Sequence, residues 1–138
     1  MMTRNGKPAF TFRLDLRSGV PVYRQLIDQV MGAKAAGTLV VGDQLPTVRQ
    51  VAVDLAINPN TVARAWREME IRGVLETQQG LGTFISDQKI ERREVERRRL
   101  LDQLTTDFVA RAGGAGFTIA DLIEQLEERL KDAGKTKK

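Results

Sequence analysis

Residues 45–66 read LPTVRQVAVDLAINPNTVARAW, and residues 80–85 read GLGTFI. The first string contains two runs of apolar residues at helical spacing, separated by a turn at residues 57–60. The second string contains two glycines, which are typical of the tip of a β-hairpin. Two helices around a turn, followed by a hairpin, predict a domain that places one helix in the major groove of DNA and the hairpin against the DNA backbone.

Three helices are predicted before the hairpin. Apolar spacing indicates the first over residues 22–36, and residues 42–46 predict a turn after it. Thr47 and Asn58 are placed to cap the second and third helices, and the third is expected to run to Arg72. The predicted inward residues of the second helix are Val48, Val51, Ala52 and Leu55. The predicted packing stripe of the third is Val62, Ala65, Trp66, Met69 and Ile71.

The rest of this first domain, residues 9–86, consists of extended segments. Residues 74–78 and 83–86 predict the two strands of the hairpin, with a turn at residues 79–82. Residues 9–16 alternate apolar and polar side chains, which predicts a short strand or an extended arm. A disordered tail is expected over residues 1–8.

The composition changes after Asp87, and residues 87–133 predict a second, helical domain. A long helix dense in Arg and Glu is expected over residues 89–112, with ion pairs four residues apart on a solvated surface. The string GGAG at residues 113–116 is expected to break it before Thr118 caps a last helix, and residues 134–138 are expected to form a solvated tail. The fold class is therefore mainly α with a small β-wing, as an N-terminal winged helix-turn-helix plus a C-terminal two-helix dimerisation appendage.

The apolar faces of these C-terminal helices favour a homodimer. Four helices from two copies can share one small core, which a single partner helix cannot provide. A monomeric helical hairpin that folds back on the winged domain is the alternative. The predicted dimerisation residues are Leu101, Leu104, Phe108, Ile119, Leu122, Ile123, Leu126 and Leu130.

Composition narrows the class of protein. The 138 residues carry a net charge of +4 and contain no Cys and no His, so disulfides, thiolate metal sites and imidazole chemistry are excluded. No cofactor or metal is expected, and no arrangement of acids or nucleophiles suggests an enzyme. No apolar run approaches the ~18 residues of a membrane helix, and the first residues lack a signal sequence, so we expect a cytoplasmic protein without a membrane partner.

Small polar residues and arginines form the candidate DNA contacts. The first turn of a recognition helix meets base edges, and a helix N-terminus with a guanidinium favours phosphate. Glycines in the wing allow close approach of the backbone to DNA. The predicted DNA-binding residues are Thr47, Arg49, Asn58, Asn60, Thr61, Arg64, Gln79 and Gly80.

Each contact has a structural alternative. Asn58 and Thr61 can serve only as caps, and for Asn58 alone the cap is the better interpretation. Arg64 can be a solvated charge, and Arg49 can form a surface salt bridge with Asp54 or Glu68. The wing glycines can serve only the turn. Tyr23 and Trp66 lie in apolar helical stripes, which places them in the core rather than on a stacking surface.

The chain resembles the GntR family of bacterial transcription regulators. The resemblance covers Phe10 to Ser86 and lies in the strings GVPVYRQL at residues 19–26, GDQLPTVR at 42–49, NPNTVARA at 58–65 and GLGTFI at 80–85. It implies a winged helix-turn-helix that binds double-stranded DNA at a palindromic operator as a dimer. Carried over by position, Arg49 resembles a phosphate- or base-contacting arginine, and Gly80 a wing-tip contact to the minor groove.

The short C-terminal part resembles the YtrA-type members of that family. In those proteins two helices dimerise the chain, and the target genes are often membrane transporters. The roughly fifty residues after Ser86 are too few for the large effector domains of other subfamilies. A homodimeric repressor is thus the preferred interpretation, and whether a small-molecule effector exists stays open.

Two other functions remain open at this point. The same fold serves activators and plasmid or phage regulators. A different class, a protein-interaction adaptor, would act through its C-terminal helices rather than its winged domain.

Overall fold

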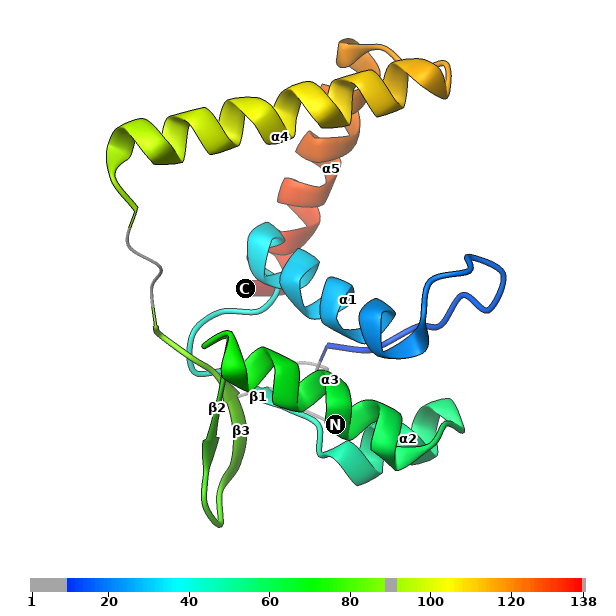
Figure 1. Ribbon diagram of the computed structural model, residues 1–138, viewed down its shortest axis with the longest axis vertical. Helices are drawn as coiled ribbons and strands as arrows, with labels where there is room; N and C mark the ends of the chain where they lie inside the picture. Colours follow the sequence, from blue (N-terminus) through cyan, green and yellow to red (C-terminus); the bar gives the residue numbers. More distant parts are fainter. Residues whose placement is uncertain (1–9, 89–91, 138) are drawn as a thin grey trace. The chain divides into compact units, whose positions relative to one another are not determined.

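The computed structural model describes residues 10–88 and 92–137, with side chains up to Ala133. The predicted tail at residues 1–8 and the predicted helix start at residues 89–91 lie outside this part. The chain divides into two compact units (Figure 1). The first contains the described residues up to Gln88 together with those from Ala133 onward, and the second contains the described residues between them.

The first unit begins with three helices: α1 (Val22–Ala36), α2 (Val48–Leu55) and α3 (Pro59–Ile71). Local sequence determines where they begin and end. The side-chain oxygen of Thr47 accepts a hydrogen bond from the backbone N–H of Gln50 at 3.1 Å, and that of Asn58 from Asn60 at 2.8 Å. Both predicted caps are confirmed. Gly37 ends α1 in the left-handed conformation that glycine adopts without strain.

A three-stranded antiparallel sheet completes this unit: β1 (Gln44–Leu45), β2 (Leu75–Gln78) and β3 (Gly82–Ile85), in the order β1-β3-β2. The β2–β3 hairpin is the predicted wing. The prediction of a turn over residues 42–46 was wrong in part, because β1 pairs with β3 there. A two-residue strand has no periodicity of its own, and only pairing with distant residues creates it.

The core of the first unit lies between α1, α3 and the base of the sheet. Its largest fully buried side chains are Leu26, Ile27, Val30, Val62, Met69 and Ile85. Trp66 is 3% exposed, as predicted, whereas Ile71 is 78% exposed. The prediction for Ile71 was wrong because it lies two positions after Met69, about 200° further around the helix.

The N-terminal segment is an extended arm rather than a strand. The side chain of Gln29 hydrogen-bonds both the N–H and the carbonyl of Arg13, and that of Gln25 does the same for Asp15. Two glutamines on α1 thus take the place of a partner strand. They hold the ring of Phe12 in the core, 5.6 Å from that of Trp66. Leu16 shares the parity of Phe12 but is 82% exposed, because the arm has turned away before it.

The second unit contains α4 (Glu94–Gly114) and α5 (Ile119–Lys137) as far as Asp132. The break lies within residues 113–116, as expected: Gly113 and Gly114 still continue α4, Ala115 ends it, and the chain turns at Gly116 with a φ of 94°. Thr118 begins α5 as predicted, and α5 extends to Lys137, beyond the expected start of a tail at residue 134. Across the described residues, no helix combines the length and apolar character required to cross a membrane.

Candidate nucleic-acid interface

A tight turn joins α2 to α3. Ala56 adopts a left-handed φ of 55°, and the N–H of Ile57 donates to the carbonyl of Ala52 at 3.0 Å. This backbone angle and this hydrogen bond end α2 within one residue and let α3 begin at Pro59, whose missing N–H costs nothing at the first helical position. The sequence therefore builds the compact helix-turn-helix that was predicted.

The third helix, α3, has two chemically different faces. Val62, Ala65, Trp66 and Met69 are buried against the rest of the first unit. Asn60, Arg64 and Arg67 are exposed on the other side, and Thr61 is half-buried at its edge. The first turn contains no acidic residue, so the positive end of the helix dipole is not neutralised there. This exposed face can donate hydrogen bonds to an acceptor-rich, negatively charged surface.

The N-terminus of α2 presents a second set of donors. Thr47 and Arg49 are exposed, and no acidic residue lies in the first turn. Within the described residues Arg49 has no ion-pair partner, so the alternative of a salt bridge with Asp54 or Glu68 does not hold in this structure. Its guanidinium is available to a phosphate.

Asn58 is engaged in the cap of α3. Its side-chain oxygen accepts from Asn60, and its carbonyl accepts from the N–H of Thr61 at 3.0 Å. These bonds agree with the interpretation of Asn58 as a cap. Its exposed amide nitrogen remains the part of the side chain that a phosphate or base can reach.

Arg64 is held by its neighbours. The guanidinium carbon lies 3.7 Å from the centre of the Tyr23 ring, and Nε lies 3.7 Å from a carboxylate oxygen of Glu68. Glu68 also faces Arg72 at 3.7 Å. Helical spacing predicts Tyr23 as a core residue only. It is half-buried, and the face of its ring supports Arg64.

The wing tip is open to its surroundings. The N–H of Leu81 donates to the carbonyl of Gln78 at 2.9 Å, and Gly80 has a φ of 80°. A Cβ on Gly80 would meet nothing within 4 Å, and Gln79 and Leu81 are exposed. Figure 1 shows the hairpin projecting beyond the helices of its own unit. Backbone at this tip can approach a ligand closely.

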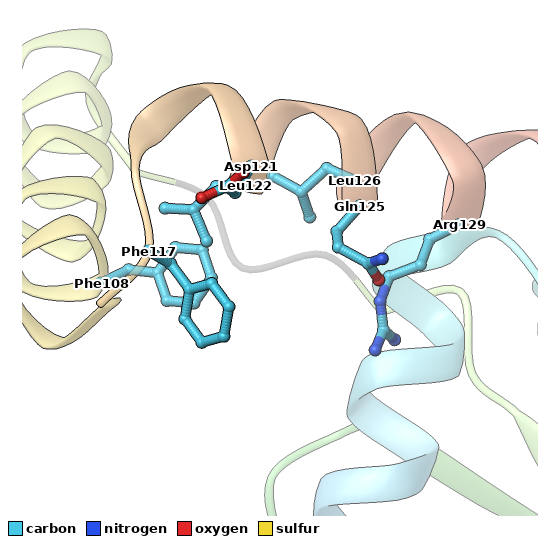
Figure 2. Close-up of a pocket in the computed structure, with 7 residues that line it drawn as sticks. All are labelled: Phe108, Phe117, Asp121, Leu122, Gln125, Leu126 and Arg129. Carbon is cyan, nitrogen blue, oxygen red and sulfur yellow. The ribbon is translucent and has the colours of Figure 1, made fainter. Parts of the chain in front are cut away.

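The helical unit carries a different kind of surface. An open groove of about 260 Å³ lies between the end of α4 and α5, with Phe108 and Phe117 at one end and Arg129 at the other (Figure 2). Leu122 is half-buried, whereas the other predicted dimerisation residues are 48–70% exposed. They are Leu101, Leu104, Phe108, Ile119, Ile123, Leu126 and Leu130.

The Arg- and Glu-rich start of α4 is solvated, as predicted. Arg98 and Glu94 form an ion pair four residues apart at 3.6 Å, with both side chains more than two-thirds exposed. Such a pair contributes little to stability. No group of three or more acidic side chains suited to a metal occurs in residues 10–88 and 92–137.

Comparison with known proteins points to one family. The model of the gntR family of bacterial regulatory proteins matches residues 22–85. The chain is 32% identical over 126 residues to the HTH-type transcriptional repressor YtrA of Bacillus subtilis, covering 91% of this chain and 97% of that protein. The crystal structure of a transcriptional regulator from Oenococcus oeni is similar, with a TM-score of 0.54, 33% identity, and coverage of 85% of this chain and 97% of that one. YtrA from Sulfolobus acidocaldarius, a GntR-family transcription factor, has a TM-score of 0.53 and 27% identity, with coverage of 72% and 97%.

Proposed function

Because the chain belongs to the gntR family of bacterial regulatory proteins, we propose that it is a homodimeric repressor that binds a palindromic operator. It is a transcription regulator with a DNA-binding domain, and not an enzyme. The observation that carries the proposal is the exposed polar face of α3, flanked in one unit by the N-terminus of α2 and by the open wing tip.

The proposed contacts follow from the placement of each side chain. Asn60, Thr61 and Arg64 lie on the first two turns of α3, where side chains reach base edges in the major groove. Thr47, Arg49 and the amide of Asn58 lie at helix N-termini, which suits phosphate. Gln79 and the backbone of Gly80 would enter or flank the minor groove. Phosphate contacts set the register of the protein, and the base contacts read the sequence.

The exposed apolar side chains of the helical unit support the homodimer. On α4 they recur at spacings of three and four residues over 101–108, and on α5 they do so over 119–130. Two such stripes in one short unit leave more apolar surface in water than an isolated helical hairpin tolerates. A second copy would cover both, and a two-fold dimer would offer two recognition helices to half-sites ~34 Å apart.

Repression is proposed from the similarity to the named repressor of Bacillus subtilis. A dimer seated on an operator beside a promoter would act by excluding RNA polymerase. The resemblance to YtrA-type members supports transporter genes as targets. Chromatin immunoprecipitation with sequencing would test this, because bound sites away from any transporter operon would contradict it.

The first experiment is binding to the DNA upstream of the protein's own gene, measured by fluorescence anisotropy. A scrambled DNA of equal length and composition is the control, and both are titrated against salt. The proposal predicts a preference of about a thousandfold or more for the natural DNA at moderate salt. Equal affinities with equal salt dependence would leave only the non-specific electrostatic attraction between protein and phosphates. In that case selection from random DNA would test whether any sequence is preferred, and failure there would refute sequence-specific binding.

A further inference from the structure

The wing tip is tied to the body of its unit by one side chain. The amide nitrogen of Gln44, in β1, donates a hydrogen bond to the carbonyl of Leu81 at 3.1 Å. Gln44 pairs with Phe84 in the sheet register, so its side chain extends along β3 to a residue three positions closer to the tip. The sequence of this segment predicts only a turn, and no local pattern indicates the contact.

Gly82 provides the space for this side chain. A Cβ at Gly82 would lie 2.5 Å from the amide nitrogen of Gln44, well inside van der Waals contact. Gly82 also has a φ of 129°, which side-chain-bearing residues rarely adopt. Both its backbone conformation and its missing side chain are therefore used in the hairpin.

Without this contact the tip has few restraints. Gln79, Gly80 and Leu81 are exposed, and the turn itself supplies one backbone hydrogen bond, from Leu81 to Gln78. The next side-chain contact across the hairpin, between the hydroxyls of Thr77 and Thr83 at 3.3 Å, lies below the turn. A short two-stranded hairpin that is not packed on other elements is only marginally ordered in water.

We propose that Gln44 is a positioning residue, which holds the wing tip in the conformation that contacts DNA. It touches no DNA itself in this proposal. It lowers the conformational entropy that residues 79–81 lose on binding, because they are already ordered in the free protein. The inference rests on the proposed DNA-binding function. The part of it that concerns the order of the wing tip applies to the free protein alone.

The first test compares the full-length wild type with Gln44→Ala by NMR relaxation in the absence of DNA. The order parameters of the Gly80 and Leu81 amides should fall from about 0.85 in the wild type to below about 0.6 in the variant. Gln44→Lys keeps a donor of similar reach and should retain the wild-type order. Unchanged order parameters in Gln44→Ala would overturn the proposal.

The second test measures affinity for the best DNA site found for the wild type. Gln44→Ala should bind about three- to tenfold more weakly, the range that loss of one neutral hydrogen bond produces, and its melting temperature should fall by no more than about 8 °C. Equal affinity of Gln44→Ala and wild type would overturn the positioning role, even if the tip became mobile. If the wild-type protein preferred no DNA site, the proposed function would be refuted. The NMR result would still decide whether Gln44 orders the wing tip.

A third test uses the crowding at Gly82. Gly82→Ala should disorder the tip both by backbone strain and by displacing Gln44. In the double variant Gln44→Ala/Gly82→Ala there is no Gln44 side chain left to displace. Its loss of binding free energy should therefore be smaller than the sum of the losses in the two single variants. Strictly additive losses would show that Gly82 is needed for its backbone alone, which contradicts the proposed packing of Gln44.

Discussion

The guanidinium of Arg64 lies on the ring of Tyr23 and beside the carboxylate of Glu68, so its position is restrained before any DNA is present. An exposed cation–π contact contributes about 0.5–1 kcal/mol, and an exposed ion pair contributes less. These energies are small enough for Arg64 to leave Glu68 for a base, and large enough to reduce the number of rotamers that it samples.

Replacing Tyr23 therefore tests whether this restraint matters. Tyr23→Leu removes the aromatic face and should weaken operator binding by about 0.5–1 kcal/mol. Tyr23→Phe keeps the ring and should bind like the wild type. The measurement is anisotropy with the preferred DNA site. Equal losses in both variants would assign the effect to the hydroxyl instead.

Removing the arginines themselves distinguishes two kinds of contact. Arg49→Ala and Arg64→Ala should each cost about 1–3 kcal/mol of operator binding. Arg64→Ala should also relax the preference at one base pair, whereas Arg49→Ala should lower the salt slope by about one ion without changing sequence preference. Arg111→Ala, in the last turn of α4, is the control for loss of a positive charge. Wild-type affinity in a folded Arg49→Ala or Arg64→Ala variant would refute that assignment.

Among the helices and strands, those determined by neighbouring residues were predictable from the sequence. The caps at Thr47, Asn58 and Thr118 depend on side chains within three residues, so a local pattern reveals them. The wing was predictable from its glycines. Strand β1 was not, since it exists only through pairing with β3 about forty residues later.

The same limit applies to the candidate site. Which residues of α3 are exposed follows from helical spacing, and Asn60 and Arg64 lie on the exposed face as expected. Tyr23, which contacts Arg64, and Gln44, which contacts the wing tip, come from other elements. No residue spacing within α3 or the hairpin indicates them. Local patterns in this sequence therefore predict which residues are exposed, but not which side chains from different elements contact each other.

The start of α5 should respond to pH. The backbone N–H of Thr118 donates to the carboxylate of Asp121, and this bond, followed by that of the Thr118 side chain, lowers the pKa of Asp121 below its ordinary value. A lowered pKa in the folded state means that the contribution is fully present above the pKa of the unfolded chain and is lost as pH falls through the folded value.

Melting temperatures of the wild type and Asp121→Asn test this. The wild type should be the more stable at about pH 7, and the difference should shrink as pH falls below about 3.9, the ordinary pKa of an Asp side chain. Comparing the two proteins removes the titration of all other carboxylates. A difference that does not change with pH would contradict the role of the charge.

At the scale of the whole molecule, the two units differ in how they bury apolar side chains. The winged unit has a continuous core, whereas the helical unit leaves most of its large apolar residues about half-exposed or more. The proposed dimer resolves this difference, because each copy would supply the surface that the other lacks.

Charge on the apolar face of α5 tests the dimer. Leu122→Glu or Leu126→Glu should produce monomers, since a buried, unpaired carboxylate costs more than the interface gains. Sedimentation velocity measures the outcome. Lys131→Glu places the same side chain on the polar face of the helix and should remain dimeric. A dimer that persists in both leucine variants would refute this interface.

The burial of Trp66 supplies a built-in optical reporter. It is the chain's only tryptophan, it lies 3% exposed beside Phe12, and the helical unit has none. Its emission therefore records the integrity of the winged unit, while far-ultraviolet circular dichroism also records α4 and α5. Denaturation curves from the two signals coincide if the units unfold as one and separate if they unfold in turn. One unlabelled sample can thus report whether the DNA-reading half of the molecule depends on the other half for its stability.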